Sequence, residues 1–150
     1  MNNLSIRQAV LADLDALSVL FDGYRVFYGR ESNVAAAKEF LLARFEHGQS
    51  VLFIAFDGAT AVGFTQLYPS FSSVSLGRIY ILNDLFVHAS ARGKGAGAQL
   101  LSAAIKFGKS VGAIRLALST ALTNTKAQAL YETEGWERDD DFFYTYTIRP

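Results

Sequence analysis

The 150-residue sequence contains no cysteine, and this absence excludes several kinds of chemistry at once. Disulfides, thiolate nucleophiles, iron–sulfur clusters and cysteine-based zinc sites all need a thiol side chain. The two histidines, His47 and His88, lie far apart and have no residues at metal-ligand spacing around them. We therefore expect a protein that works without a bound metal.

The sequence also lacks an excess of charge of either sign. It has 14 Lys and Arg residues against 14 Asp and Glu residues, so its formal net charge is zero. Binding to the phosphates of nucleic acid would need a basic stripe, and the sequence shows none. No apolar run approaches the roughly 18 residues of a membrane span, and residues 1–10 do not have the pattern of a targeting segment. These absences predict a cytoplasmic protein with neither nucleic acid nor membrane as a partner.

What the sequence does contain is enough apolar surface for one core. Half of the residues are apolar (51%), 13% are aromatic and only 19% are charged, which is typical of a globular chain. The length fits one domain, and no repeat, low-complexity tract or linker interrupts it. We therefore expect a single domain at residues 1–150.

The first third of the chain predicts a strand followed by two helices. Alternating apolar residues indicate a short strand within 4–10, and helical spacing then continues from Asp13 to about Tyr28. Ser32 or Asn33 can cap a second helix that ends at Gly48. Its expected buried stripe consists of Phe40, Leu41, Leu42 and Phe45.

The middle of the chain predicts an antiparallel sheet. Apolar runs at 51–56 and 61–68 flank Asp57-Gly58, which is typical of a hairpin. Pro69 and the serines near it predict a loop, and 78–88 predicts the next strand. The sheet is therefore expected to grow by antiparallel neighbours.

The last third predicts a parallel crossover and a closing strand. A helix from Gly95 to about Gly108 or Gly112 precedes a strand at 114–119, and this order favours parallel pairing. A short helix at 124–134 ends at Gly135. The aromatic-rich segment 142–148 predicts the final strand of an α/β fold.

The most informative segment is 85–98, where a strand passes through a glycine-rich loop into a helix. Backbone N–H groups at a helix start, the helix dipole and the close approach that glycine permits together favour phosphate binding. Arg92 and Lys94 add positive charge between the glycines. The alternative is a turn that merely joins strand to helix, and the interleaved cations favour the phosphate site.

Two nucleotide-binding motifs compete for this loop. Gly93, Gly95 and Ala98 formally match the dinucleotide pattern G-x-G-x-x-[GA], which expects an acidic residue about 20 positions later to bind the ribose. No Asp or Glu occurs between Gln99 and Tyr131. A P-loop would need a Lys-Ser or Lys-Thr pair after the glycines, and that pair is absent. Both motifs are therefore disfavoured.

The same loop resembles the acetyl-CoA pyrophosphate loop of the GNAT family of N-acetyltransferases. The matching pattern is Arg92-x-x-Gly95-x-Gly97, with a strand before it and an amphipathic helix after it. A second segment, 124–136, resembles the family pattern N-x-x-A-x-x-L-Y-E-x-x-G-[FW]. The resemblance implies the GNAT fold, in which about four helices flank a mixed, largely antiparallel sheet of six to seven strands.

The resemblance also implies acetyl-CoA as the acetyl donor. In the family the strand before the loop splays from its neighbour, and this implies that the Phe86 or Val87 amide binds the acetyl carbonyl. The residues then expected to bind acetyl-CoA are Leu85, Phe86, Val87, Arg92, Gly93, Lys94, Gly95, Ala96, Gly97, Ala98, Asn124, Lys126, Ala127 and Tyr131.

Tyr131 is the residue that the resemblance assigns as general acid for the coenzyme A thiolate. Its phenol has a reference pKa of about 10, and helical spacing predicts that Asn124, Ala127 and Tyr131 share one face. The alternative is a tyrosine of the core with no chemical role.

The acceptor amine must lose a proton before it attacks, and Asp84 is the carboxylate best placed in the sequence to accept it. Asp84 precedes an apolar strand segment, so it is either a base or amine anchor, or a half-exposed strand residue. The polyamine branch of the family implies an acid where this chain has Asn83. Tyr28, Asn83 and Asp84 are the expected acceptor-binding residues, and His88 is a further candidate base.

The function that the resemblance implies is transfer of acetyl from acetyl-CoA to a primary amine of a small molecule or peptide, by direct attack in a ternary complex. One alternative is a degenerate domain that binds acyl-CoA or acts as an interaction module, and another is a dinucleotide-binding enzyme. The aromatic segment 142–146 is a candidate pairing edge for a homodimer.

Overall fold

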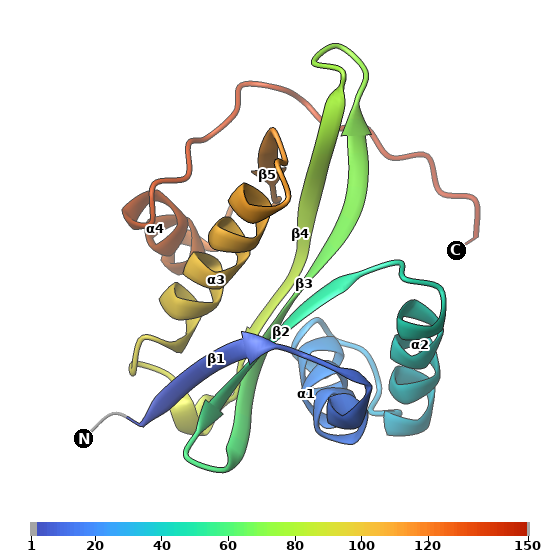
Figure 1. Ribbon diagram of the computed structural model, residues 1–150, viewed down its shortest axis with the longest axis vertical. Helices are drawn as coiled ribbons and strands as arrows, with labels where there is room; N and C mark the ends of the chain where they lie inside the picture. Colours follow the sequence, from blue (N-terminus) through green and yellow to red (C-terminus); the bar gives the residue numbers. More distant parts are fainter. Residues whose placement is uncertain (1–2, 150) are drawn as a thin grey trace. The chain divides into compact units, whose positions relative to one another are not determined.

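Five strands form one sheet whose spatial order follows the sequence (Figure 1). The computed structural model describes residues 3–149, in two units that divide between Ser119 and Thr120. The elements of the first unit are β1 (Leu4–Gln8), α1 (Leu14–Phe27), α2 (Val34–Glu46), β2 (Val51–Asp57), β3 (Thr60–Ser72), β4 (Gly77–Val87), α3 (Ala96–Ser110) and β5 (Arg115–Ala117), with short 3-10 turns at Leu11–Asp13 and Ala89–Ala91. The second unit contains α4 (Thr125–Thr133).

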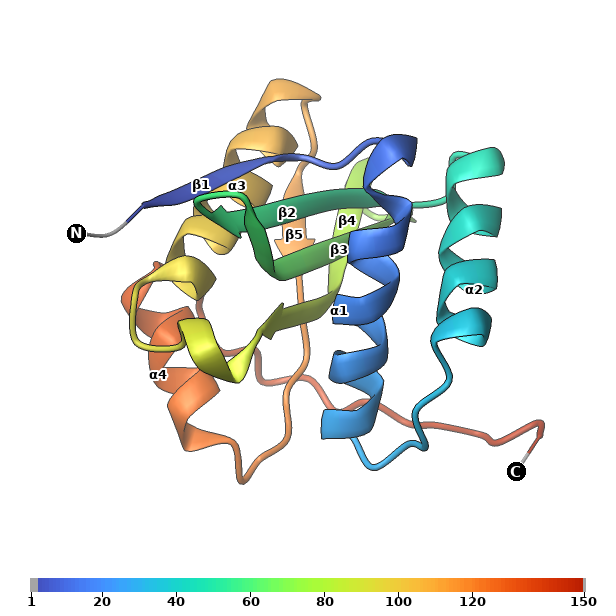
Figure 2. The same cartoon turned by 90° about the horizontal axis from the view of Figure 1, so that it is seen from below.

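The sheet is mixed, as predicted. β1 to β4 pair antiparallel, whereas β5 pairs parallel to β4 after the crossover through α3. Figure 2 shows α1 and α2 on one side of this sheet and α3 on the other. The core between α1, α2 and the sheet contains Leu17, Leu41, Ile54 and Phe64, which have no solvent exposure. The α/β fold class inferred from the sequence is confirmed.

The two predicted helices of the first third are present, and Asn33 is the cap of the second. Its side chain accepts from the Ala36 N–H at 3.0 Å. The buried stripe of α2 agrees with the expected one in part. Leu41 is fully buried and Leu42 and Phe45 pack against the core, while Ala37 is buried one turn before Leu41. Phe40 is 40% exposed, and its ring stacks on that of Phe21 with 5.6 Å between centroids.

The loop predicted at Pro69 is wrong, because β3 continues to Ser72. Proline is tolerated there because β2 begins at Val51, opposite Leu67, so that β3 has a neighbour on only one side beyond this point. A strand with one open edge accommodates a residue that has no N–H to donate.

The closing strand predicted at 142–148 is also absent, so the described residues form five strands rather than six or seven. The large side chains of this segment are exposed. Its aromatic residues favour the extended conformation, but a strand also needs a neighbour that takes its backbone hydrogen bonds. The acidic residues at 139–141 favour a loop before it.

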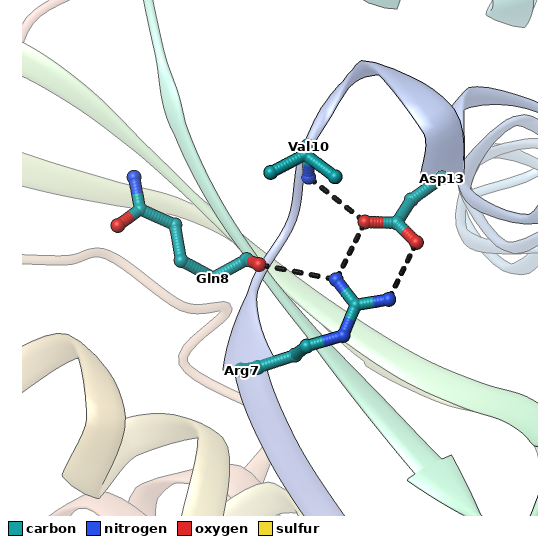
Figure 3. Close-up of polar contacts among 4 residues, drawn as sticks. All are labelled: Arg7, Gln8, Val10 and Asp13. Atoms are coloured by element: carbon teal, nitrogen blue, oxygen red, sulfur yellow. Dashed lines mark hydrogen bonds and ion pairs between the residues drawn. The ribbon is translucent and has the colours of Figure 1, made fainter.

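An ion pair between Arg7 and Asp13 joins β1 to the start of α1 (Figure 3). Arg7 Nη1 and Nη2 each donate to one Asp13 carboxylate oxygen at 2.7 Å, and the Val10 N–H donates to Oδ2 at 2.8 Å. The hydrogen bond from Arg7, together with that from Val10, lowers the pKa of the nearly buried Asp13 below its usual value. This contact fixes the turn between the first strand and the first helix.

We predict that Asp13→Asn lowers the Tm by about 2–4 °C at neutral pH, since a contact worth about 1 kcal/mol shifts a domain of this size by that amount. The stabilisation needs the charged carboxylate, whose folded-state pKa is lowered. It is therefore complete above about pH 5 and is lost as the pH falls below about 4. Thermal melts against pH check this, with Asp15→Asn, at an exposed pair with Lys38, as the control. A Tm difference between wild type and Asp13→Asn that persists unchanged at pH 2 would contradict it.

Candidate active site

The parting of β4 from β5 creates the main feature of the site. β5 pairs with β4 only at Ile79–Ile81, whereas pairing with β3 continues to Val87. From Leu82 onward, no strand of the described chain pairs with the β5 side of β4. Apart from the Val87 carbonyl, which accepts from Arg92, the backbone N–H and C=O groups on that side therefore lack a strand partner and can pair with an extended ligand.

The alternation of the strand decides which amides face this open edge. The His88 N–H donates to the Val62 carbonyl at 2.7 Å, so the N–H of Phe86, two residues earlier, is directed to β3 as well. The N–H groups of Leu85 and Val87 are consequently directed to the open edge. Of the two amides expected to meet the acetyl carbonyl, that of Phe86 is directed to β3, and that of Val87 faces the open edge together with that of Leu85.

A β-bulge at Asn83 sets the acceptor side of the site. Gln66 pairs with Asp84 and Leu67 pairs with Leu82, so Asn83 has no partner in β3. Its carbonyl accepts instead from the Tyr24 hydroxyl at 3.2 Å. The extra residue thus connects α1 to β4 directly beside Asp84.

Asp84 lies inside the protein and is 2% exposed, so it is not the half-exposed strand residue considered as the alternative. Its Oδ2 accepts from Gln66 Nε2 at 2.5 Å and its Oδ1 from Asn83 Nδ2 at 2.8 Å. The Thr65 hydroxyl donates to its main-chain carbonyl at 2.8 Å. Burial raises the pKa of Asp84 above its usual value, and the hydrogen bonds from Gln66, Asn83 and Tyr24 partly oppose that rise. A carboxylate in this setting accepts a proton more readily than one in water.

Two tyrosines complete the surroundings of this carboxylate. Burial and the charge of Asp84 raise the pKa of Tyr68 to about 12 and raise that of Tyr24 further. Both phenols therefore keep their protons at neutral pH, and that of Tyr24 donates to the Asn83 carbonyl. The expected acceptor-binding residue Tyr28 is 61% exposed at the end of α1, and its ring centroid lies 5.0 Å from that of Tyr24.

Sequence reasoning missed Gln66 and Tyr68. A signal for Gln66 was present, since it is the polar residue with the longest side chain in the apolar run 61–68. The bulge that aligns it with Asp84 has no such signal. His88, the further candidate base, has a structural role, because its Nδ1 accepts from the Ser90 N–H at 3.2 Å.

The glycine-rich loop has the geometry of an anion site. Gly93 and Gly95 have φ of +80° and +86°, which favours glycine at both positions. Gly95 is the N-cap of α3 and has no side chain to cap the helix. The Gln99 N–H donates to the Gly95 carbonyl at 3.1 Å, so the preceding amides of Ala96, Gly97 and Ala98 are the ones at the helix start without an intrahelical acceptor.

The two cations of the loop each contact other elements of the first unit. Arg92 Nε donates to the Val87 carbonyl at 3.1 Å, and its guanidinium carbon lies 5.8 Å from the Phe27 ring centroid. Lys94 Nζ lies 3.1 Å from Asp57 Oδ2. This places the side chain of Arg92 at the open edge of β4, because the Val87 carbonyl faces that edge.

The second unit contains the other predicted residues on or beside α4. Asn124 is the N-cap of this helix rather than a member of its face, and its Oδ1 accepts from the Ala127 N–H at 3.2 Å. Lys126 is exposed on the first turn, whereas Ala127 and Tyr131 are half-buried. The ring centroids of Tyr131 and Trp136 lie 6.4 Å apart.

Two kinds of feature are absent from the described part of the chain. Residues 3–149 contain no group of three His, Cys, Asp or Glu side chains that could bind a metal ion. Within the same range, no helix has the length and apolar character needed to cross a membrane.

Comparison with known proteins places this geometry in a family. Residues 17–136 match the Acetyltransferase (GNAT) family. The chain is 50% identical over 141 residues to the uncharacterized N-acetyltransferase YhfO of Bacillus subtilis (strain 168), covering 94% of this chain and 95% of that protein. It also resembles a crystal structure of a probable acetyltransferase, with 40% identity, a TM-score of 0.92, and coverage of 97% and 99% of the two chains.

A more distant structure shares the fold. The aminoglycoside N-acetyltransferase AAC(6')-Iy in complex with CoA has a TM-score of 0.82 at 20% identity, over 99% of this chain and 97% of that one. The open edge of β4, the glycine loop and the family match agree with one another. The chain therefore belongs to the GNAT family, whose members take the acetyl group from acetyl-CoA, and it is an acyltransferase.

Proposed function

We propose that this protein transfers the acetyl group of acetyl-CoA to a primary amine of a small molecule or peptide, by direct attack in a ternary complex. The observation that carries the proposal is the open edge of β4, which has an uncapped helix N-terminus at one end and a buried carboxylate beside it. Because the family match spans both units, we propose that residues 1–150 act as one domain.

The donor is proposed to lie along the open edge. The amides of Ala96, Gly97 and Ala98 bind its pyrophosphate, with charge from Arg92 and Lys94, and Gly93 and Gly95 let it approach the main chain. The pantetheine arm then pairs with the outward-facing N–H and C=O of Leu85 and with the N–H of Val87, whose carbonyl accepts from Arg92. One of these two amides binds the acetyl carbonyl and stabilises the oxyanion, and Phe86 contributes packing.

The acceptor is proposed to bind near Asp84, Asn83 and Tyr28. An amine reaches the enzyme as R–NH3+, and Asp84 takes one proton, directly or through water. The neutral nitrogen attacks the thioester carbon, the C–S bond breaks and the nitrogen loses a second proton. The products are R–NH–CO–CH3 and coenzyme A, with one proton on the thiol and one released to solvent. Tyr131 supplies the thiol proton and is reprotonated afterwards.

The remaining residues of the second unit are assigned to the donor by their position in the family pattern. Asn124, Lys126 and Ala127 are proposed to contact acetyl-CoA near Tyr131. The alternative of a degenerate acyl-CoA-binding module is disfavoured because both Asp84 and Tyr131 are retained. The exposed aromatic side chains within 142–146 support a homodimer as part of the proposal.

For the loop, we predict that Gly95→Asp abolishes acetyl-CoA binding, because a carboxylate at the helix start repels phosphate. Gly112→Asp is the matched control. That glycine also has a positive φ, +71°, and open space around it, but it follows the C-terminal end of α3. Calorimetry on both folded variants checks the prediction, and unchanged affinity in Gly95→Asp would remove the loop from the donor site.

For Asp84, we predict that Asn at this position lowers turnover by roughly 10²- to 10⁴-fold, the usual loss for a missing general base. Affinity for acetyl-CoA stays close to that of the wild type, because the substitution lies outside the phosphate loop. The measurement is thiol release with a panel of amines from pH 5 to 10. Equal activity at every pH would exclude Asp84 from the reaction.

For Tyr131, we predict that Phe preserves folding and acetyl-CoA binding but slows a single turnover by one to several powers of ten. A tyrosine with a structural role alone gives a different result, namely a lower Tm and an unchanged rate per folded molecule. Melting and single-turnover measurements on the same sample separate these outcomes.

A further inference from the structure

Gln66 is a buried polar side chain beside Asp84 that the proposed reaction does not use. It lies in β3 with no solvent exposure, directly opposite Asp84 in the ladder. Its Nε2 donates to Asp84 Oδ2 at 2.5 Å, whereas its Oε1 is buried and accepts no hydrogen bond from any described group. A glutamine amide carries one donor group and one acceptor, so the same side chain can offer either of them to the neighbouring carboxyl.

The two protonation states of Asp84 need different partners at Oδ2. When Asp84 is ionised, its Oδ2 needs a donor, and Gln66 Nε2 supplies one. When Oδ2 is protonated, the same Nε2 would meet another donor. A half-turn of the Gln66 amide about its last torsion exchanges nitrogen for oxygen at nearly the same place, and Oε1 then accepts the new O–H.

We propose that Gln66 is a positioning residue for Asp84, which holds the carboxylate through Nε2 before proton transfer and through Oε1 after it. This inference rests on the proposed function for its catalytic consequence. Its structural part, that Gln66 favours the ionised form of Asp84, stands on the geometry of β3 and β4. The proton balance is R–NH3+ and Asp84–COO⁻ giving R–NH2 and Asp84–COOH, with no other reactant.

The other groups that face Asp84 do not duplicate this role. Asn83 donates to Oδ1 from an exposed position, and the hydroxyl of Tyr24 in α1 donates to the Asn83 carbonyl. Tyr68 of β3 carries a proton at neutral pH, and the charge of Arg44 in α2 partly opposes the rise in the pKa of Tyr68. Among the described residues, Gln66 is therefore the amide that contacts Oδ2 from the buried side.

The test is the pH dependence of kcat/KM in Gln66→Met, which keeps a similar volume and has no N–H. Both hydrogen bonds are lost in this variant, and the one to the charged form is the stronger, so we expect the acidic limb to move up by about 1 pH unit. On that limb kcat/KM falls about 10-fold, while well above it the variant approaches the wild type. An unmoved limb would overturn the proposal.

Thr65→Val is the matched control. Thr65 is the neighbouring residue of β3, equally buried, and its hydroxyl donates to the main-chain carbonyl of Asp84 rather than to the carboxylate. We expect a lower Tm and an unmoved limb in this variant. If Thr65→Val moves the limb as far as Gln66→Met does, the effect comes from general disruption of β3 and the proposal fails.

A second variant and a direct titration cover the remaining outcomes. Gln66→Glu keeps the shape and brings a second carboxyl to Asp84, so the limb should move up further, since two neighbouring carboxylates resist joint ionisation. The carboxyl ¹³C titration of Asp84, assigned by its loss in Asp84→Asn, needs no acetyl transfer. A higher pKa in Gln66→Met than in wild type supports the inference even if Asp84 proves dispensable for turnover, and equal values overturn it whatever the activity.

Discussion

The loss of the β5 neighbour beyond Ile81 is the constraint on which the rest of the site depends. β4 keeps its ladder with β3 to Val87, so it remains part of the sheet while its other edge has no strand neighbour. The strand then runs into the glycine loop, which places a helix N-terminus at the end of that edge. A polar chain ending in phosphate is the kind of ligand that such an edge and such a helix start accept together.

The bulge at Asn83 couples this open edge to the acceptor chemistry. It leaves a carbonyl for Tyr24 and aligns Asp84 with Gln66, so that a carboxylate is buried at the point where the strand begins to separate. Burial makes the carboxylate a better proton acceptor, while its amide and phenol donors keep it usable near neutral pH. Donor and acceptor chemistry therefore depend on the irregularities of one strand.

The sequence predicted those parts of the fold that local patterns determine. Helix caps such as Asn33, the Asp57-Gly58 turn and the Arg92-x-x-Gly95-x-Gly97 loop are short-range signals, and the structure contains each of them. Long-range pairing was harder to predict. The extension of β3 past Pro69 depends on where β2 starts, the missing strand at 142–148 depends on a neighbour, and the role of Gln66 depends on a bulge in another strand.

The most direct test of this account is amide hydrogen exchange, followed residue by residue by NMR, with and without acetyl-CoA. The account predicts that acetyl-CoA slows exchange at Leu85 and Val87 and at Ala96, Gly97 and Ala98, while Phe86, already paired with β3, changes little. Binding that leaves Leu85, Val87 and the helix start unprotected, or no binding at all, would contradict the claim that the open edge of β4 is the donor site.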